Sequence, residues 1–404
     1  MGIILRGGIL MNLLFITSRN IYSTNGELRL IKNRANVLYE KFGIVTDFIC
    51  YHDDDVLHEE QELINNVCDF TLITYSKKNP FTLFVNKNKV IDRMKEMLNT
   101  KSYDAVIISG EFALQYVTAI KKLVNIPVVY DVHGATNELI EFRGSSVSNN
   151  VFRRLLFILL RYYEKRNAKK FDAAFVVTEE LKNHVISNFS ADNLKFFIIP
   201  CAKKYSEMKL DTYFDLRKKY RDKYNISDDA RLFIYSGGIS PWQCIDKTVD
   251  LFEEISKEIG NCKFLLLSDQ AKKLEVNNDD IITDTLPYNM VDETLCAGDF
   301  AFMLRDDLVT NHVAFPNKYC EYIASGMKII TSPYLKTVAK NIDEHELGYV
   351  MSGSNDVKGV VQYVKDNKSI NVDMNKRYEV LKSFEFERTL VPFVEYLKGE
   401  LNEG

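Results

Sequence analysis

The alternation of short apolar runs with longer helical patterns constrains this chain more than any other feature. Runs rich in β-branched and aromatic residues are typical of buried strands, and regular alternation with helices is typical of parallel sheets covered on both faces. In the first half the predicted strands are residues 13–17, 46–49, 70–73, 105–109, 128–131, 173–177 and 196–199. The sequence therefore predicts an α/β domain with a doubly wound sheet.

The same pattern then begins again, and a chain of 404 residues is long enough for two separate cores. The second set of predicted strands is 232–236, 263–267, 281–283, 300–304 and 328–331. We expect two doubly wound, Rossmann-like domains facing a cleft, with residues 1–200 as the first and 201–385 as the second. Residues 386–404, read as a single amphipathic helix from 386 to 401, are expected to pack back on the first domain.

Composition excludes several classes of protein. Hydrophobic residues make up 46% and charged residues 27%, which is typical of a globular protein, and a net charge of −4 disfavours nucleic acid as a partner. The seven cysteines are scattered without a C-x-x-C pair, which indicates buried thiols in a reducing compartment. The longest apolar run, 155–160, is too short to cross a bilayer, so we expect a cytoplasmic protein. Residues 1–10 are left out of this reasoning.

The segment 316–325 is predicted to be a helix with chemically useful residues on one face. Pro316 suits its first turn and Gly326 the position after its end. Lys318, Glu321 and Tyr322 are three to four residues apart and so share a face. A cation suits a diphosphate and a carboxylate suits ribose hydroxyls, and the helix start favours an anion. The alternative is a surface ion pair between Lys318 and Glu321.

Two neighbouring strand ends offer further groups for an anion. Arg305 follows the strand 300–304, at the edge of a parallel sheet where ligands bind, and it can grip a diphosphate with two hydrogen bonds. A salt bridge to Asp306 or Asp307 is the alternative. Gly237 and Gly238 follow the strand 232–236 and allow close approach to phosphate, with Ser240 as the expected N-cap of the next helix.

The run 314–330 resembles the donor-binding signature of the family 4 glycosyltransferases, whose one branch carries P-x-K-x-x-E-Y-x-A-x-G. This resemblance implies a retaining enzyme of the GT-B fold, of the bacterial surface-polysaccharide type and a hexosyltransferase in class. It implies that Glu321 binds ribose, that Lys318 and Arg305 contact the phosphates, and that His133 contacts the donor sugar. The expected catalytic residues are His133, Arg305 and Lys318, and the expected donor-binding residues are Gly237, Gly238, Ser240, Glu321 and Tyr322.

The expected donor is a nucleotide sugar, a UDP-sugar in preference to a GDP-sugar. The expected acceptor is a glycan or a lipid-linked molecule, and neither a cofactor nor a metal is expected. Three positions depart from the family pattern. Gly238 and Gln243 stand where the wider family has Arg and Lys, and Val313 stands where it has glutamate. These departures make a partner protein without catalytic activity a credible alternative. A nucleotide-sugar epimerase on the same fold is a further alternative.

In the first half, His133 follows the strand 128–131 and can orient a sugar hydroxyl near neutral pH. A capping or core histidine is the alternative. Asp131 and Glu138 are expected either to bind the acceptor or to hold His133. In the loop after the first strand, Arg19 and Asn25 are weaker candidates for acceptor binding. The acidic run 52–55 is interpreted as a solvated loop rather than a metal site.

The segment 152–166 combines an apolar helix with arginines at both ends. Such a pattern is found in helices that lie on membrane surfaces, and a lipid-linked acceptor would make contact with the inner face of a membrane useful. A buried helix whose arginines extend to solvent explains the same residues, and it is the interpretation that we favour.

Overall fold

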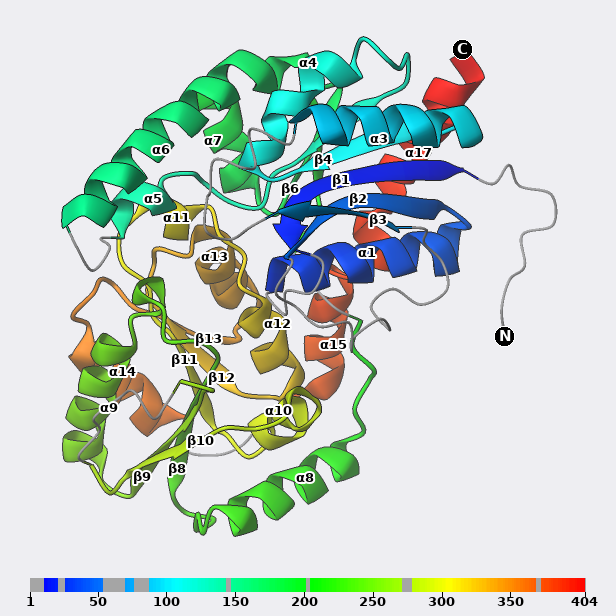
Figure 1. Cartoon of the computed structure of the whole chain (residues 1–404). Helices are drawn as coiled ribbons and strands as arrows, with labels where there is room; N and C mark the ends of the chain where they lie inside the picture. Colours follow the sequence, from blue (N-terminus) through cyan, green and yellow to red (C-terminus); the bar gives the residue numbers. More distant parts are fainter. Residues whose placement is uncertain are drawn as a thin grey trace. The chain divides into compact units, whose positions relative to one another are not determined.

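A computed structural model describes residues 11–20, 26–53, 70–75, 87–142, 147–200, 204–270, 278–367 and 372–403. The chain divides into two units, one formed by Met1–Lys203 with Glu385–Gly404 and the other by Lys204–Phe384. The sequence places the boundary at Pro200, close to this division. Each unit is a parallel sheet with helices on both of its faces, as the alternating pattern predicts (Figure 1).

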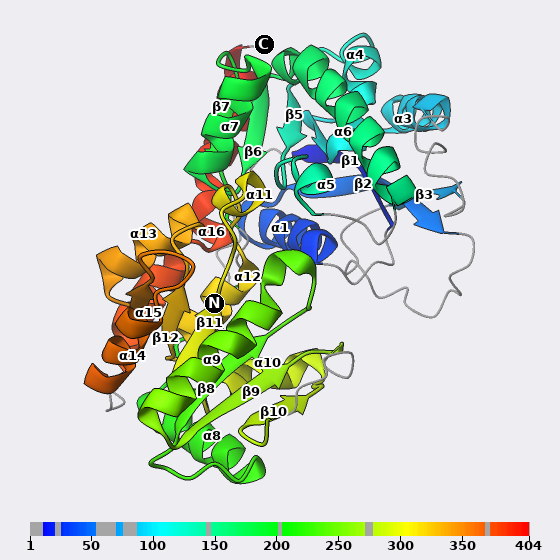
Figure 2. The ribbon, with the colours of Figure 1, turned by 90° about the vertical axis from the view of Figure 1, so that its left-hand side faces the viewer.

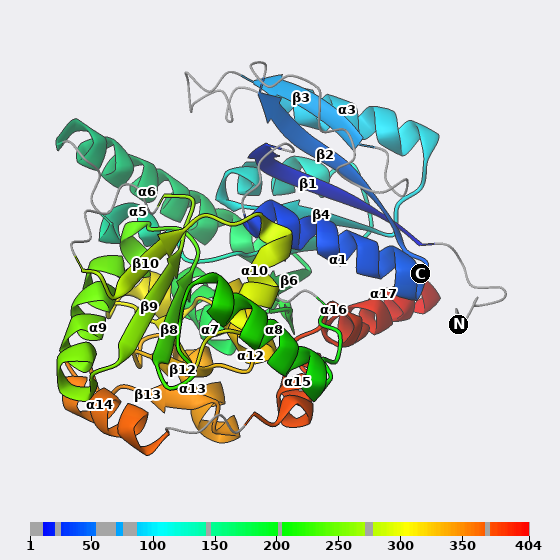
Figure 3. The ribbon, with the colours of Figure 1, turned by 90° about the horizontal axis from the view of Figure 1, so that it is seen from below.

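The sheet of the first unit has, within the described residues, seven parallel strands in the order β3-β2-β1-β4-β5-β6-β7. Figure 3 shows β3, β2, β1 and β4 side by side. These strands are β1 (Asn12–Asn20), β2 (Val45–Asp53), β3 (Phe70–Tyr75), β4 (Ala105–Ser109), β5 (Val128–Asp131), β6 (Ala173–Val176) and β7 (Lys195–Ile198). The central strands β4, β5 and β6 are buried along their whole length. Strands buried on both faces read as continuous apolar runs, which is why the sequence located them well.

The helices of the first unit cover both faces of this sheet. Helix α1 (Gly26–Phe42) shares one core with α16 (Phe386–Thr389) and α17 (Val391–Glu403), at the end of the chain. The opposite face carries α3 (Lys87–Thr100), α4 (Val117–Ile120) and α6 (Val147–Asn167), with α5 (Glu138–Glu141) and α7 (Glu179–Phe189) beside α6 (Figure 2). The expected return of the chain end to the first domain is therefore confirmed.

The expectation of one helix from 386 to 401 is wrong in detail, because the segment forms two helices. They meet at Leu390, and Pro392 lies in the first turn of α17. Proline has no N–H to donate and its ring clashes with the preceding turn, so a helix cannot run through this position without losing a hydrogen bond. The break lets Phe386, Leu390 and Phe393 all enter the core.

The sheet of the second unit has, among the described residues, six parallel strands in the order β10-β9-β8-β11-β12-β13. They are β8 (Arg231–Ser236), β9 (Cys262–Leu267), β10 (Ile281–Asp284), β11 (Phe300–Met303), β12 (Lys328–Thr331) and β13 (Gly348–Val350). The sequence missed β13, which is three residues long and begins with glycine. A Cβ at Gly348 would collide with the backbone of Ile329, so the glycine permits the pairing with β12.

The helices of the second unit also form two layers. Helices α9 (Ile245–Ile259) and α14 (Val357–Asp366) share a core with one face of the sheet. On the other side α8 (Leu210–Lys223) contacts α10 (Tyr288–Leu295), and α12 (Asn317–Ala324) contacts α10 and α15 (Met374–Lys382). The short α11 (Val309–His312) precedes α12, and α13 (Lys336–His345) precedes β13.

Both strand orders reverse direction once, between β1 and β4 in the first unit and between β8 and β11 in the second. In doubly wound sheets, ligands bind at the carboxyl ends of the strands at this reversal. The residues that follow β8 and β11, and those that follow β1 and β4, are therefore the first places to look for function.

The described cysteines, Cys50, Cys244, Cys262, Cys296 and Cys320, are buried thiols, as expected. Cys68 and Cys201 lie outside the described residues.

Candidate functional site

The turn after β8 brings a glycine and a lysine from distant parts of the second unit together. Gly237 has a φ of 132°, and a Cβ built on it would lie 2.6 Å from the Nζ of Lys318. Glycine is required here twice, for the backbone conformation and for the space that the lysine fills. At Gly238, by contrast, nothing lies within 4 Å of a Cβ.

Lys318 is half-buried on α12 and points toward this turn. Its ammonium lies 2.6 Å from the hydroxyl oxygen of Tyr235 and 2.8 Å from Oε1 of Gln243, and it stands 4.1 Å from the centre of the Tyr235 ring. These contacts hold the ammonium of Lys318 beside Tyr235 and Gln243. They take the place of the predicted alternative, a surface ion pair with Glu321.

Arg305 approaches the same place from the end of β11. Its side chain is buried, and Nη2 donates to Oε1 of Gln243 at 2.9 Å while Nη1 donates to the carbonyl of Leu304. The acids that the sequence suggested as its partners are engaged elsewhere: Asp306 pairs with Lys247, and Asp307 lies 2.7 Å from His312. Arg305 is thus directed toward the turn rather than into a local salt bridge.

Gln243 is the centre of this cluster. A single amide oxygen accepts hydrogen bonds from Arg305, from Lys318 and, at 3.0 Å, from the hydroxyl of Tyr235. Two cationic groups therefore meet at a neutral acceptor. The sequence indicates only that Gln243 replaces a lysine of the family. It does not indicate that Gln243 accepts hydrogen bonds from both Arg305 and Lys318.

Burial makes the positive charges of Lys318 and Arg305 energetically unfavourable. Burial, and then the charge of Arg305, lower the pKa of the Lys318 ammonium well below its ordinary value, although Glu321 acts in the opposite direction. Burial also lowers the pKa of the Arg305 guanidinium. A phosphate placed here would relieve both effects, since a buried cation is stabilised by a nearby anion.

The other predicted donor-binding residues take different positions. Tyr322 is completely buried, and its hydroxyl accepts the N–H of Ser236 at 3.0 Å, so it supports the turn from inside the core. Glu321 is half-buried on α12. Ser240 makes no side-chain capping bond, because residues Pro241–Gln243 form a 3-10 turn and α9 begins only at Ile245.

In the first unit, His133 lies just beyond β5 with its Nε2 held from two directions. Asp131 Oδ2 is 3.0 Å away and the hydroxyl of Ser109, at the end of β4, is 2.8 Å away. Of the two roles left open for Asp131, the structure favours the support of His133. Glu138 is exposed on α5. The side chain of Arg19, Asn25 and the side chains of 52–55 lie outside the described residues.

Asp131 also binds Arg34 of α1, a residue that sequence analysis missed. The guanidinium donates to both carboxylate oxygens, at 3.1 and 2.5 Å, and both side chains are buried. Burial alone would raise the pKa of Asp131, but Arg34 and His133 outweigh it and hold the pKa far below its ordinary value. No sequence pattern links Arg34 to a strand end 97 residues away.

A second buried carboxyl group supports the loop after His133. Glu164 of α6 accepts a hydrogen bond from the hydroxyl of Thr136 at 3.0 Å. Burial, followed by the charge of Glu111, raises the pKa of Glu164 to about 8, despite the hydrogen bond from Thr136 and the charge of Arg161.

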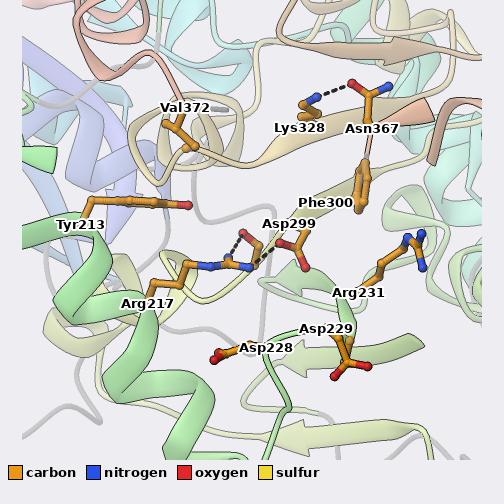
Figure 4. Close-up of a pocket in the computed structure, with 13 residues that line it drawn as sticks. Tyr213, Arg217, Asp228, Asp229, Arg231, Asp299, Phe300, Lys328, Asn367 and Val372 are labelled. Carbon is orange, nitrogen blue, oxygen red and sulfur yellow. Dashed lines mark hydrogen bonds and ion pairs between the residues drawn. The ribbon is translucent and has the colours of Figure 1, made fainter. Parts of the chain in front are cut away.

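A pocket of about 210 Å³ in the second unit lies at the opposite edge of the sheet from the predicted site (Figure 4). It opens at the starts of β8, β11 and β12, where Arg231, Phe300 and Lys328 lie. Within its lining, Arg217 and Asp299 form an ion pair at 2.5 Å, and Lys328 donates a hydrogen bond to Asn367. None of the predicted donor-binding residues lines this pocket.

Comparison with known proteins agrees with the expected family. Residues 37–202 match the family model described as Glycosyltransferase Family 4. This segment resembles a domain of that family. It includes β2 to β7 of the first unit and His133. No curated protein sequence matches the chain significantly.

Solved structures resemble the chain over nearly its whole length. Sucrose-phosphate synthase from Thermosynechococcus elongatus has a TM-score of 0.71 at 12% identity, covering 98% of this chain and 100% of its own. A glycosyltransferase from Rickettsia africae gives 0.64 at 14% identity, with 98% and 99% covered. HepE from Anabaena, in complex with UDP and glucose, gives 0.65 at 12% identity, with 96% and 100% covered. The GT-B fold is thus confirmed, and together with the domain family it supports a glycosyltransferase.

Proposed function

We propose that this protein is a retaining glycosyltransferase of the hexosyl type. It transfers the sugar of a nucleotide-diphosphate sugar to a glycan or lipid-linked acceptor. The observation that carries the proposal is the meeting of Arg305 and Lys318 at one neutral oxygen of Gln243. A buried and a half-buried cation that meet at a neutral oxygen form a site that suits a diphosphate.

The chemistry that these groups offer is charge stabilisation. Departure of the nucleoside diphosphate leaves negative charge on its phosphate oxygens, and preorganised cations in a partly dry site stabilise that charge. The role that the resemblance gives to Glu321, binding the ribose hydroxyls, places a carboxylate three residues from Lys318. A front-face attack, in which a donor phosphate oxygen helps to deprotonate the acceptor, keeps the anomeric configuration and needs no nucleophile from the protein.

Several finer features belong to the proposal by resemblance. A UDP-sugar is the favoured donor, His133 contacts the donor sugar, and the acceptor belongs to bacterial surface-polysaccharide or glycoconjugate synthesis in the cytoplasm. The departures at Gly238, Gln243 and Val313 keep a non-catalytic partner as the second candidate. An epimerase on the same fold is the third, and it would isomerise the donor without an acceptor.

Thermal unfolding in the presence of a panel of nucleotide sugars tests the binding step. We expect stabilisation by one donor class, since a ligand at 100 times its Kd stabilises the folded state by about 2.7 kcal/mol. Lys318→Ala and Glu321→Ala should each lose this stabilisation. Lys340→Ala and Glu344→Ala remove an exposed pair on α13 of the same unit and should keep it.

The result then separates the candidates. An unchanged melting temperature with every nucleotide sugar would exclude both the transferase and the epimerase. Binding without transfer or hydrolysis of a radiolabelled donor would favour the non-catalytic partner, and isomerised donor would identify an epimerase.

A further inference from the structure

The outer face of α6 exposes a continuous row of large apolar side chains. Val151 is 54% exposed, Leu155 62%, Ile158 57% and Tyr162 53%. Their spacing of four, three and four residues places them on one stripe along the helix. The sequence interpretation that we favoured, a buried helix, is therefore wrong for this face.

The orientation of α6 is fixed by contacts on its other sides. Leu160 and Glu164 are buried, Arg161 donates to Asn188 of α7, and Arg153 donates to the carbonyls of residues 138 and 139 in α5. The helix cannot turn its apolar stripe inward without breaking these bonds. Exposure of the stripe is thus a property of the folded unit rather than of a loosely attached helix.

The apolar surface continues from α6 onto α5. Ile140 is 44% exposed, and an open groove of about 570 Å³ lies between the two helices. Its wall includes Phe142, Phe157 and Ile158, and Arg154 stands on it as the charged residue. A surface of this kind, apolar and bordered by charge, marks an interaction site.

Positive charge gathers at the carboxyl end of the same face. Lys165, Arg166 and Lys169 are exposed there, and Arg166 donates to the hydroxyl of Tyr162 at 2.7 Å. Burial, and then the nearby charges of Arg166 and Lys169, lower the pKa of Lys170. The acid of α6, Glu164, is buried, and the acids of α5 adjoin the other end of the helix beside Arg153.

A second copy of this chain would suit such a face poorly, because two basic ends would meet or would cover apolar residues with charge. The structure assigns the stripe of α6 to another occupant: we propose that it docks on a bilayer containing anionic lipids. The stripe enters the boundary of the acyl chains, and Arg154, Lys165, Arg166 and Lys169 contact lipid phosphates. Among the described residues no helix is long and apolar enough to span a membrane, so the contact is peripheral.

Co-sedimentation of the full chain with vesicles tests this proposal. We expect binding to phosphatidylcholine vesicles that contain phosphatidylglycerol, and weaker binding to phosphatidylcholine alone. Leu155→Glu with Ile158→Glu should reduce binding at least about tenfold, since each removes several buried methylene groups and adds a repelled charge. Lys165→Gln and Arg166→Gln should each reduce vesicle binding about fivefold. Added salt should also weaken vesicle binding.

The matched control is Leu210→Glu with Phe214→Glu, an apolar pair on α8 of the second unit that is 48% and 45% exposed, and this variant should bind vesicles as the unchanged protein does. Failure of the unchanged protein to bind anionic vesicles would overturn the proposal. A dimer in solution that the Leu155→Glu and Ile158→Glu pair dissociates, without vesicle binding, would instead assign the face to a second copy. The vesicle measurement needs no donor, so its outcome is separate from that of the proposed transferase activity.

Discussion

The two units share one strand order, but their strand ends balance charge in opposite ways. At the end of β5, the carboxylate of Asp131 is neutralised within the fold by Arg34 and His133. Beyond β8 and β11, the cations Arg305 and Lys318 are gathered on the neutral amide of Gln243. The first arrangement pairs opposite charges within the fold, whereas the second brings two cations to a neutral acceptor and would be stabilised by a bound anion. A shared fold therefore does not imply a shared kind of site.

The largest loss of stability is expected when the buried pair between Arg34 and Asp131 in the first unit is broken. Asp131→Asn leaves the Arg34 guanidinium buried without its carboxylate, and breaking a buried pair in this way costs about 3–5 kcal/mol. Urea denaturation, with hydrogen exchange of β4 and β5 to localise the loss, measures it. Asp92→Asn breaks an exposed pair with Lys95 and should cost about 0.5 kcal/mol or less. Equal losses in the two variants would show that the Arg34 pair is not special.

Adding a carboxylate to the second unit should make it resemble the first. In Gln243→Glu the new charge neutralises Arg305 and Lys318 and repels a diphosphate, so donor affinity should fall roughly a hundredfold, about 2.7 kcal/mol. The ligand-free protein should melt at a higher temperature. Calorimetric titration measures the affinity, and Gln243→Met, which adds no charge, should lose much less. Unchanged affinity in Gln243→Glu would place the donor phosphates elsewhere.

The turn after β8 offers a smaller perturbation with a close control. Gly237→Ala forces a positive φ on alanine and displaces the Lys318 side chain, so we expect a loss of about 1–3 kcal/mol in stability and weaker donor binding. Gly238→Ala meets open space and should leave the stability nearly unchanged. If the two variants lose the same stability in thermal unfolding, the lysine is not held as described.

Stability should depend on pH with opposite signs in the two units. The folded pKa of Glu164 is raised to about 8, so the unfolded chain releases this proton first and the first unit loses stability as pH rises from about 4.3 to 8. The folded pKa of Lys318 is lowered, so the folded chain releases that proton first and the second unit gains stability as pH rises toward the unfolded value.

Two variants isolate these contributions. Relative to the unchanged protein, Glu164→Gln should gain up to about 1.4 kcal/mol per pH unit across the lower window. Lys318→Met should show the reverse trend in alkaline solution. If the free energy of unfolding of a variant changes with pH in parallel with that of the unchanged protein, the substituted group does not contribute to the pH dependence.

Sequence reasoning found the strands because buried parallel strands are written as uninterrupted apolar runs, and β4, β5 and β12 begin and end where predicted. It missed β13, whose three residues carry no pattern of their own. It also directed attention to Lys318 and Arg305, because charged residues beside predicted strand ends stand out. Which side chains are catalytic or donor-binding stays a prediction.

The partners of those residues escaped prediction for a different reason. Arg34 lies in the middle of a helix, far along the chain from Asp131, and only the completed sheet brings them together. Gln243 is uncharged and stands where the family has a lysine. Its amide oxygen accepts hydrogen bonds from Tyr235, Arg305 and Lys318, and local sequence does not predict these contacts. Tyr322 fits a binding motif by spacing, but its hydroxyl bonds the backbone inside the core.

The return of the chain end to the first unit has a consequence for biosynthesis. Phe393 stacks edge-on against Phe175 and Phe197, with ring centres 4.7 and 5.5 Å apart, and it shares their core with Leu390 and Leu397. A ribosome makes the first half of the protein long before it makes these residues. The nascent first unit must therefore wait with an uncovered apolar face while the second unit, which is continuous in sequence, can already fold. The part made first is completed last.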